Sequence, residues 1–91
     1  MIKPTVGRKV WYWPSEYDLK GLGAMVAAHL QPLDATVVCV HGDRMVNLVV
    51  FDANGNMHKC TSVTLVQEGD TKPDGRYCEW MPYQIAQAKP A

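Results

Sequence analysis

The sequence lacks the features that mark a membrane protein, a secreted protein or a protein that binds a phosphate backbone. Its 91 residues contain no apolar run that approaches the roughly 18–20 residues of a transmembrane helix. The segment from Met1 to Thr5 has no apolar core of a signal peptide. Nine basic and nine acidic side chains cancel, whereas nucleic acids and anionic membranes attract a surplus of lysine and arginine. We therefore expect no membrane partner and regard nucleic acid as an unfavoured one.

Motifs of catalysis and of cofactor binding are also missing. The glycines follow neither a phosphate-loop nor a dinucleotide-binding pattern. Most of the nine carboxylates lie in segments rich in turn residues, where aspartate commonly stabilises turns. The pattern offers no group that would activate a cysteine as a nucleophile. We expect a protein that is not an enzyme and that carries no cofactor.

What the chain does have is a central stretch, residues 35–61, that reads as a meander of three strands. Two apolar runs, 35–41 and 44–51, are separated by Gly-Asp, and Asp-Ala-Asn-Gly separates the second run from the segment 56–61. Apolar runs of this length between clusters of glycine, aspartate and asparagine are typical of β-hairpins. Side chains alternate between the two faces of a strand, so the register decides which residues are buried.

The first turn is interpreted as a two-residue loop at Gly42-Asp43. This loop places Cys39 opposite Val46 and Val37 opposite Leu48. With the second turn described next, the face predicted to be buried consists of Val37, Cys39, Val46, Leu48 and Val50.

The second turn has two possible forms. A two-residue Asn-Gly loop would place polar residues on the apolar face. A three-residue loop, a type I turn with Gly55 left-handed in a bulge, places Val50 opposite His58 and Leu48 opposite Cys60. We prefer the bulged form because it keeps Cys60 on the buried face.

Cysteine and histidine in the meander invite comparison with a metal site. The candidate ligands are Cys39, His41, His58, Cys60, Cys78 and His29. The pairs at 39–41 and 58–60 fall on the two outer strands of the meander, about 9–10 Å apart. A zinc ion needs every ligand at about 2.0–2.3 Å, so we expect no metal site. Three cysteines, an odd number, are interpreted as reduced thiols.

The flanking segments complete the predicted order of elements. Residues 6–13 read as a first strand, and 15–34 as a long connection that is either a short helix over 19–30 or an irregular excursion. A tight turn at 62–63 leads into a closing strand at 64–67. Residues 76–80 read as either a last edge strand or an extended arm. The C-terminal arm, 76–91, should be ordered against the sheet from residue 76 to residue 83, because its apolar groups would be costly to leave in water.

Aromatic residues are the one feature of the chain that points to function. The tryptophans and tyrosines fall in two groups, Trp11, Tyr12, Trp13 and Tyr17 before the meander and Tyr77, Trp80 and Tyr83 after it. On one interpretation, Trp80 plugs an end of a small barrel, against Tyr12 and Val10. On the other, the remaining aromatic residues form a binding surface, because aromatic residues are enriched at interaction hot spots. The residues proposed to line that surface are Trp11, Trp13, Tyr17 and Tyr83.

Several short motifs resemble a family of small, uncharacterised bacteriophage and prophage proteins. The motifs are Val6-Gly7-Arg8, Tyr12-Trp13-Pro14, the run 46–52, Thr61-Ser62-Val63, Leu65-Val66-Gln67 and Glu79-Trp80-Met81-Pro82. The resemblance covers most of residues 5–83 and departs at 15–31, where this chain is longer. It implies an SH3-like fold and a phage origin, hence the cytoplasm of a bacterial host or the virion. It implies no activity, ligand or functional residue.

Together these observations predict one mainly all-β domain over residues 1–91. The expected fold is a small SH3-like barrel of five strands with a long first loop and a C-terminal arm. The expected function is that of a non-enzymatic interaction module that binds a protein partner or self-associates. The alternative is a nucleic-acid-binding barrel that uses Trp11 and Trp13 with Arg8 and Lys9.

Overall fold

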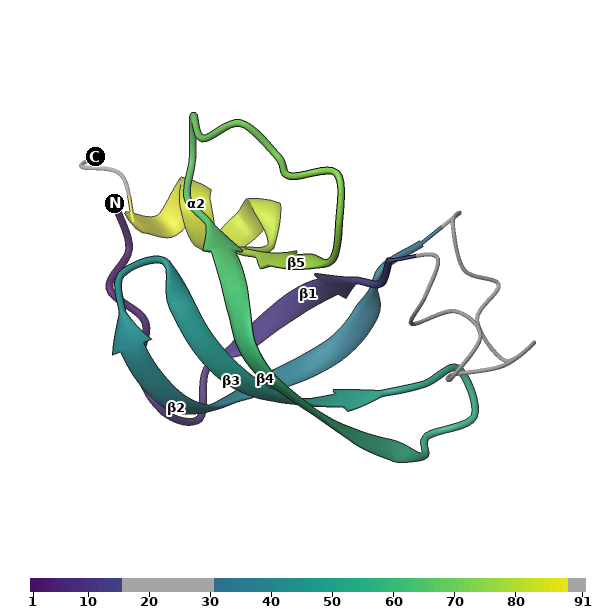
Figure 1. Ribbon diagram of the computed structural model, residues 1–91. Helices are drawn as coiled ribbons and strands as arrows, with labels where there is room; N and C mark the ends of the chain where they lie inside the picture. The colour runs from purple at the N-terminus through teal and green to yellow at the C-terminus, as the bar shows by residue number, and fades with distance from the viewer. Residues whose placement is uncertain (16–30, 89–91) are drawn as a thin grey trace.

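The chain forms a closed barrel of five β-strands with one short helix at its end (Figure 1). The computed structural model describes residues 1–15 and 31–88, so the segment expected to be either helical or irregular, 19–30, lies outside the described residues. The elements are β1 (Lys9–Trp13), β2 (Leu33–Gly42), β3 (Met45–Phe51), β4 (Met57–Val66), β5 (Tyr77–Glu79) and α2 (Pro82–Ala88). Neighbouring strands are antiparallel except β4 and β5, which are parallel, and β1 pairs with β5 to close the barrel. The predicted small, mainly β, five-stranded barrel is confirmed.

Strand β1 begins at Lys9, three residues later than predicted. Gly7 adopts a φ of +95°, a conformation that interrupts an extended strand. Its N–H donates to the Val37 carbonyl at 2.8 Å, and the Val37 N–H donates to the Arg8 carbonyl at 2.9 Å. Residues 7 and 8 therefore stay attached to β2 but form no regular part of β1.

The hairpin between β2 and β3 differs from the predicted one by one residue. Gly42 pairs with Met45, so the turn is Asp43-Arg44 and not Gly42-Asp43. Two register shifts lie in β2, between residues 37 and 39 and between 40 and 42. Because each shift adds a residue to β2, Cys39 pairs with Asn47 instead of Val46. Such bulges bend a strand, as closure of a small barrel requires.

The strand pairing away from the β2–β3 turn, beyond these two register shifts, is as predicted. Val37 lies opposite Leu48, Val50 opposite His58 and Leu48 opposite Cys60. Gly55 has a φ of +86°, the left-handed conformation that the bulged three-residue loop requires. The predicted β3–β4 turn is therefore confirmed.

The closing strand of the barrel is not the one predicted. Residues 57–66 form one continuous strand, and the expected turn at 62–63 is a bulge in which Ser62 has a φ of +53°. The strand that closes the barrel comes from the C-terminal arm instead: β5 pairs with β4 through Leu65 and Cys78 and with β1 through Tyr12 and Cys78. A ten-residue strand has the length to pair with β3 along one part and with β5 along the other.

The core lies inside the barrel and is made by the inward side chains of all five strands. Val10 and Tyr12 of β1 are fully buried, and Trp80 is 2% exposed, as expected of a residue that plugs one barrel end. The remaining core residues are Leu33, Ala35, Val37, Val46, Leu48, Val50, Val63, Leu65 and Cys78. In the part of the chain that the structure describes, no helix is long and apolar enough to cross a membrane.

Candidate functional site

Trp11 and Trp13 lie on the outer face of β1, and both are half-buried. In the β1–β5 ladder Trp11 lies opposite Glu79, and Trp13 lies opposite Tyr77, which is also half-buried. Residues directly opposite in antiparallel strands share a face. We call the surface formed by Trp11, Trp13 and Tyr77 the aromatic face. Of the other two predicted binding residues, Tyr83 lies elsewhere on α2, and Tyr17 lies outside the described residues.

Glu79 holds the aromatic face in place. Its Oε2 accepts a hydrogen bond from the Trp13 indole N–H, and its Oε1 lies 3.4 Å from the Lys72 ammonium group. The same ammonium group lies 6.0 Å from the centre of the Tyr77 ring. Contacts of this kind restrict side-chain rotamers, so the rings of Trp13 and Tyr77 are ordered before any ligand arrives.

A groove runs along α2, next to the aromatic face. It consists of three adjoining hollows of about 450, 130 and 80 Å³, each lined by Glu68, Trp80 and Ile85. Trp11 lines the largest of the three, together with Pro82 and Ala86 of α2. We call these three hollows the α2 groove. Trp11 thus belongs to the aromatic face and to the α2 groove at once.

Acidic side chains predominate among the charged groups of the α2 groove. Its described lining includes the carboxylates of Glu68, Asp70 and Glu79 but one lysine, Lys72. Asp70 lies 2.8 Å from the Arg44 guanidinium, which lowers the pKa of that carboxyl together with a hydrogen bond from the backbone of Gln67. The groove therefore presents apolar walls with carboxylates beside them, of which Asp70 and Glu79 are paired with Arg44 and Lys72.

A further hollow, of about 500 Å³, lies mainly against another face of α2 and shares Met1, Ile2 and Ala88 with the smallest hollow of the α2 groove. It is lined by Met1, Ile2, Arg8, Tyr83, Gln84, Gln87 and Ala88. We call it the Arg8 hollow. Tyr83 lines this hollow and Trp11 lines the α2 groove, so the structure does not bring these two predicted site residues into one groove.

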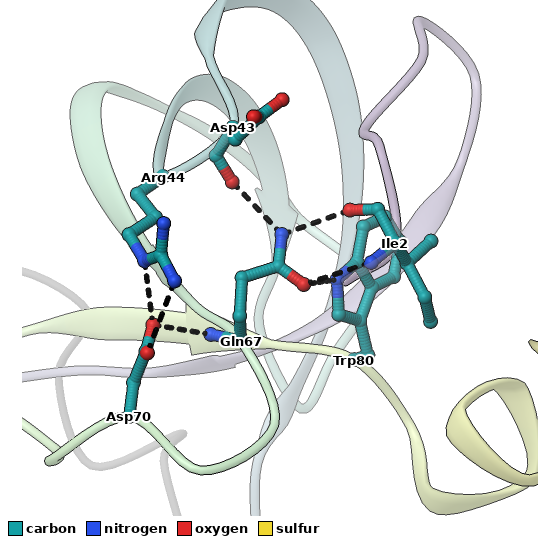
Figure 2. A network of polar contacts seen from close by, with 6 residues as sticks. All are labelled: Ile2, Asp43, Arg44, Gln67, Asp70 and Trp80. Carbon is teal, nitrogen blue, oxygen red and sulfur yellow. Dashed lines mark hydrogen bonds and ion pairs between the residues drawn. The ribbon is translucent and has the colours of Figure 1, made fainter.

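The buried side chain of Gln67 connects residues that line the α2 groove with residues that line the Arg8 hollow (Figure 2). Its Oε1 accepts hydrogen bonds from the N–H of Ile2 and from the Trp80 indole N–H, each at 3.1 Å. Its Nε2 donates to the carbonyls of Ile2 and Asp43, each at 2.8 Å. These four bonds satisfy the whole amide group. One side chain thus fixes the N-terminal segment, the β2–β3 turn and the indole that plugs the barrel.

Sequence reasoning missed Gln67 entirely. The residue follows an apolar run and carries no motif of its own. Its hydrogen-bond partners lie 65, 24 and 13 residues away along the chain, so no local sequence pattern predicts these bonds.

Helix α2 is held at its edges, and none of its residues is fully buried. The Gln84 amide donates to the carbonyl of Lys9 at 3.0 Å and accepts from the N–H of Met81 at 2.7 Å. Ile85 is half-buried and packs against the core. These contacts place Pro82, Ile85 and Ala86 towards the α2 groove, because residues three and four apart share a helix face.

The histidines and cysteines have other partners. His58 Nε2 lies 2.8 Å from the buried carboxylate of Asp52, and His41 Nε2 lies 3.0 Å from Asn47 Oδ1. Burial raises the pKa of the Cys78 thiol to about 12, so it stays protonated and is a poor nucleophile. Residues 1–15 and 31–88 hold no group of three or more side chains suited to a metal ion. None of the four hollows described above is lined by histidine or cysteine.

No protein-family model matches the chain, and no curated protein or solved structure is significantly similar to it. Function is therefore inferred from the aromatic face, the α2 groove and the Arg8 hollow.

Proposed function

We propose that this protein is a non-enzymatic interaction module that binds a protein partner, or a second copy of itself, through the aromatic face and the α2 groove. The observation that carries the proposal is the position of Trp11, half-buried between the aromatic face and a hollow of about 450 Å³. Tryptophan at the edge of a well-formed hollow is the side chain that most often dominates binding energy at protein interfaces.

The fixed positions of the rings in the aromatic face support the same proposal. Trp13 and Tyr77 are held by Glu79 and Lys72 rather than by the core. A surface whose rings are fixed in advance loses less side-chain entropy when a partner binds. The apolar walls and the carboxylates of the α2 groove suit a partner segment with apolar and basic side chains.

The biological setting is proposed from the family resemblance alone. It places the module in a phage or prophage, and hence in the cytoplasm of a bacterial host or in the virion. The partner would then be a protein of the phage or of its host.

The nucleic-acid alternative receives less support from the surroundings of β1. Lys9 pairs with Asp34 at 3.1 Å and lies 5.1 Å from the centre of the Phe51 ring, so its charge is engaged. Arg8 lines the Arg8 hollow and not the α2 groove. The strand neighbours of Trp11 are Asp34 and Glu79, which are paired with Lys9 and Lys72, so the surroundings of Trp11 offer no surplus of positive charge to a phosphate backbone.

The proposal is tested by selecting random displayed peptides on the immobilised protein and measuring the affinity of the enriched ones by fluorescence anisotropy. Sedimentation equilibrium of the protein alone tests the second-copy form. We expect Trp11→Ala to weaken whichever interaction is found by roughly 30-fold, the equivalent of a hot-spot loss of about 2 kcal/mol.

Met57→Ala is the matched control, because Met57 is 71% exposed and lies by the β3–β4 turn, far from α2 in Figure 1. It should leave the interaction unchanged. A protein that enriches no peptide and remains monomeric, or one that Trp11→Ala and Met57→Ala affect equally, would contradict the proposal.

A further inference from the structure

We propose that the Arg8 hollow is a binding site for a carboxylate group. The hollow lies mainly against a different face of α2 from the α2 groove, and the inference does not depend on the protein partner proposed above. Three groups in its lining can donate hydrogen bonds to a carboxylate: the Arg8 guanidinium, the Tyr83 hydroxyl and the Gln87 amide.

Arg8 is positioned by its surroundings before a ligand binds. Its backbone N–H donates to the carbonyl of Thr5 at 3.2 Å, and its carbonyl accepts from the N–H of Val37 at 2.9 Å. Its guanidinium lies 5.7 Å from the centre of the Trp80 ring, within the range of a cation–π contact. The Trp80 ring is itself fixed by Gln67, so a rigid support lies behind the charge.

The charge of Arg8 is not used in an ion pair within the described residues. The pairs found there involve Lys9, Arg44, His58 and Lys72. The described lining of the Arg8 hollow also contains no aspartate or glutamate. An arginine fork that faces a hollow without a competing acid can bind both oxygens of a carboxylate.

Helix α2 supplies the remaining donors on one of its faces. Tyr83 and Gln87 are four residues apart, and residues with this spacing are neighbours on a helix surface. Gln84 adds no free donor, because its amide already binds the carbonyl of Lys9. The site therefore combines the Arg8 guanidinium with two neutral donors.

This combination favours a carboxylate over a phosphate group. A carboxylate joins a planar charged group to an apolar stem, which suits a lining that places the Arg8 guanidinium beside the apolar side chains of Met1, Ile2 and Ala88. Two sources of carboxylate share this chemistry: an aspartate or glutamate side chain of a peptide, and a free organic acid.

The site is tested by NMR titration of the whole chain at low salt, observing the Arg8 Nε–H, the Trp80 indole N–H and the backbone N–H groups of α2. The probes are glutamate capped at both ends, succinate and inorganic phosphate. We expect the capped glutamate or succinate to give saturable shifts of these signals. Tighter binding of the capped glutamate would identify a peptide side chain as the source of the carboxylate, and tighter binding of succinate would identify a free organic acid.

Variants decide whether Arg8 is responsible. Arg8→Gln should weaken carboxylate binding by roughly tenfold or more, since a charge-assisted hydrogen bond is lost. Arg8→Lys keeps the positive charge but loses the two parallel N–H donors of the guanidinium. Its affinity for carboxylate should therefore lie between those of the wild type and of Arg8→Gln. Gln87→Ala should weaken binding by a smaller factor, and Lys59→Gln, which removes an exposed cation outside the hollow, should not weaken it.

Three results would overturn the inference. One is the absence of a saturable shift with both carboxylates. Another is equal binding by the wild type and Arg8→Gln when both remain folded. The third is tighter saturation of the same signals by phosphate than by either carboxylate.

Discussion

The two faces of β1 place similar residues in opposite situations. On the inner face, Val10 and Tyr12 are fully buried, while on the outer face Trp11 and Trp13 are only half-buried although both are larger than valine. Alternation along β1 directs both indoles away from the core residues. Trp11 lines the α2 groove and Trp13 lies beside it on the aromatic face, which is why we propose that this side of the strand binds a partner.

On this account the inner face of β1 contributes to the stability of the fold, and its outer face contributes to the proposed binding. Changes on the inner side should lower the free energy of unfolding. Changes on the outer side should lower affinity for a partner while the fold remains. The first prediction below changes the inner side of β1, and the next two change buried polar groups at the barrel end and at the β3–β4 turn.

The largest effect on stability is expected from Tyr12→Ala. Truncation of a fully buried aromatic side chain costs about 3–5 kcal/mol, through lost burial and the cavity that remains. For a domain whose total stability is about 5–15 kcal/mol, this change removes a large part of it. Urea denaturation measures the loss, with Met57→Ala as the exposed control. A loss no larger than that of the control would mean that β1 does not divide into these two faces.

A smaller loss is expected from Gln67→Leu. The substitution keeps a side chain of similar size but leaves the N–H groups of Ile2 and Trp80 without their acceptor. The Trp80 indole N–H is buried, whereas the Ile2 N–H is only partly buried and can turn to water, so the expected loss of stability is about 1–3 kcal/mol. The matched control is Gln87→Leu, on the exposed surface of α2. Equal stability of the two variants would show that the Gln67 network does not stabilise the barrel end.

The smallest effect concerns acid stability at the β3–β4 turn. The hydrogen bond from His58, followed by those from the N–H groups of Asn56 and Asn54, lowers the pKa of Asp52 from 3.8 to about 2. A carboxyl whose pKa is lower in the folded state stabilises the fold above about pH 3.8, and this contribution disappears as the pH falls through about 2.

Asp52→Asn should therefore flatten the dependence of the melting temperature on pH between 3.8 and about 2. Asp74→Asn, in an exposed loop, serves as the control and should keep the wild-type slope. An unchanged slope in Asp52→Asn would show that this carboxylate does not couple folding to protons.

Local rules predicted those parts of the fold whose partners are close in sequence. The β3–β4 turn was predictable because Asp52 and Gly55 specify a bulged type I loop. The β2–β3 turn was predicted one residue too early, because the two register shifts in β2 have no signature in the sequence. For the segment that contains β5, the sequence left a last edge strand and an extended arm as alternatives, because β5 has three residues and pairs with strands far along the chain.

The same distinction applies to the candidate site. Alternation along a strand was enough to place Trp11 and Trp13 outside the barrel, opposite Val10 and Tyr12. The α2 groove and the Arg8 hollow could not be predicted, because they require α2 to lie beside Trp80 and the N-terminal segment. That arrangement depends on Gln67, whose four hydrogen bonds are all formed with distant parts of the chain.

The most direct test of the central claim compares the three tryptophans of the chain in one NMR experiment. A soluble paramagnetic agent attenuates indole signals that lie near solvent, and the agent is added with and without a saturating peptide from the display selection. Trp80, which is 2% exposed, serves as the internal reference. The account predicts that the peptide protects Trp11 from attenuation and leaves Trp80 unchanged. A bound peptide that leaves Trp11 as strongly attenuated as in the free protein would contradict it.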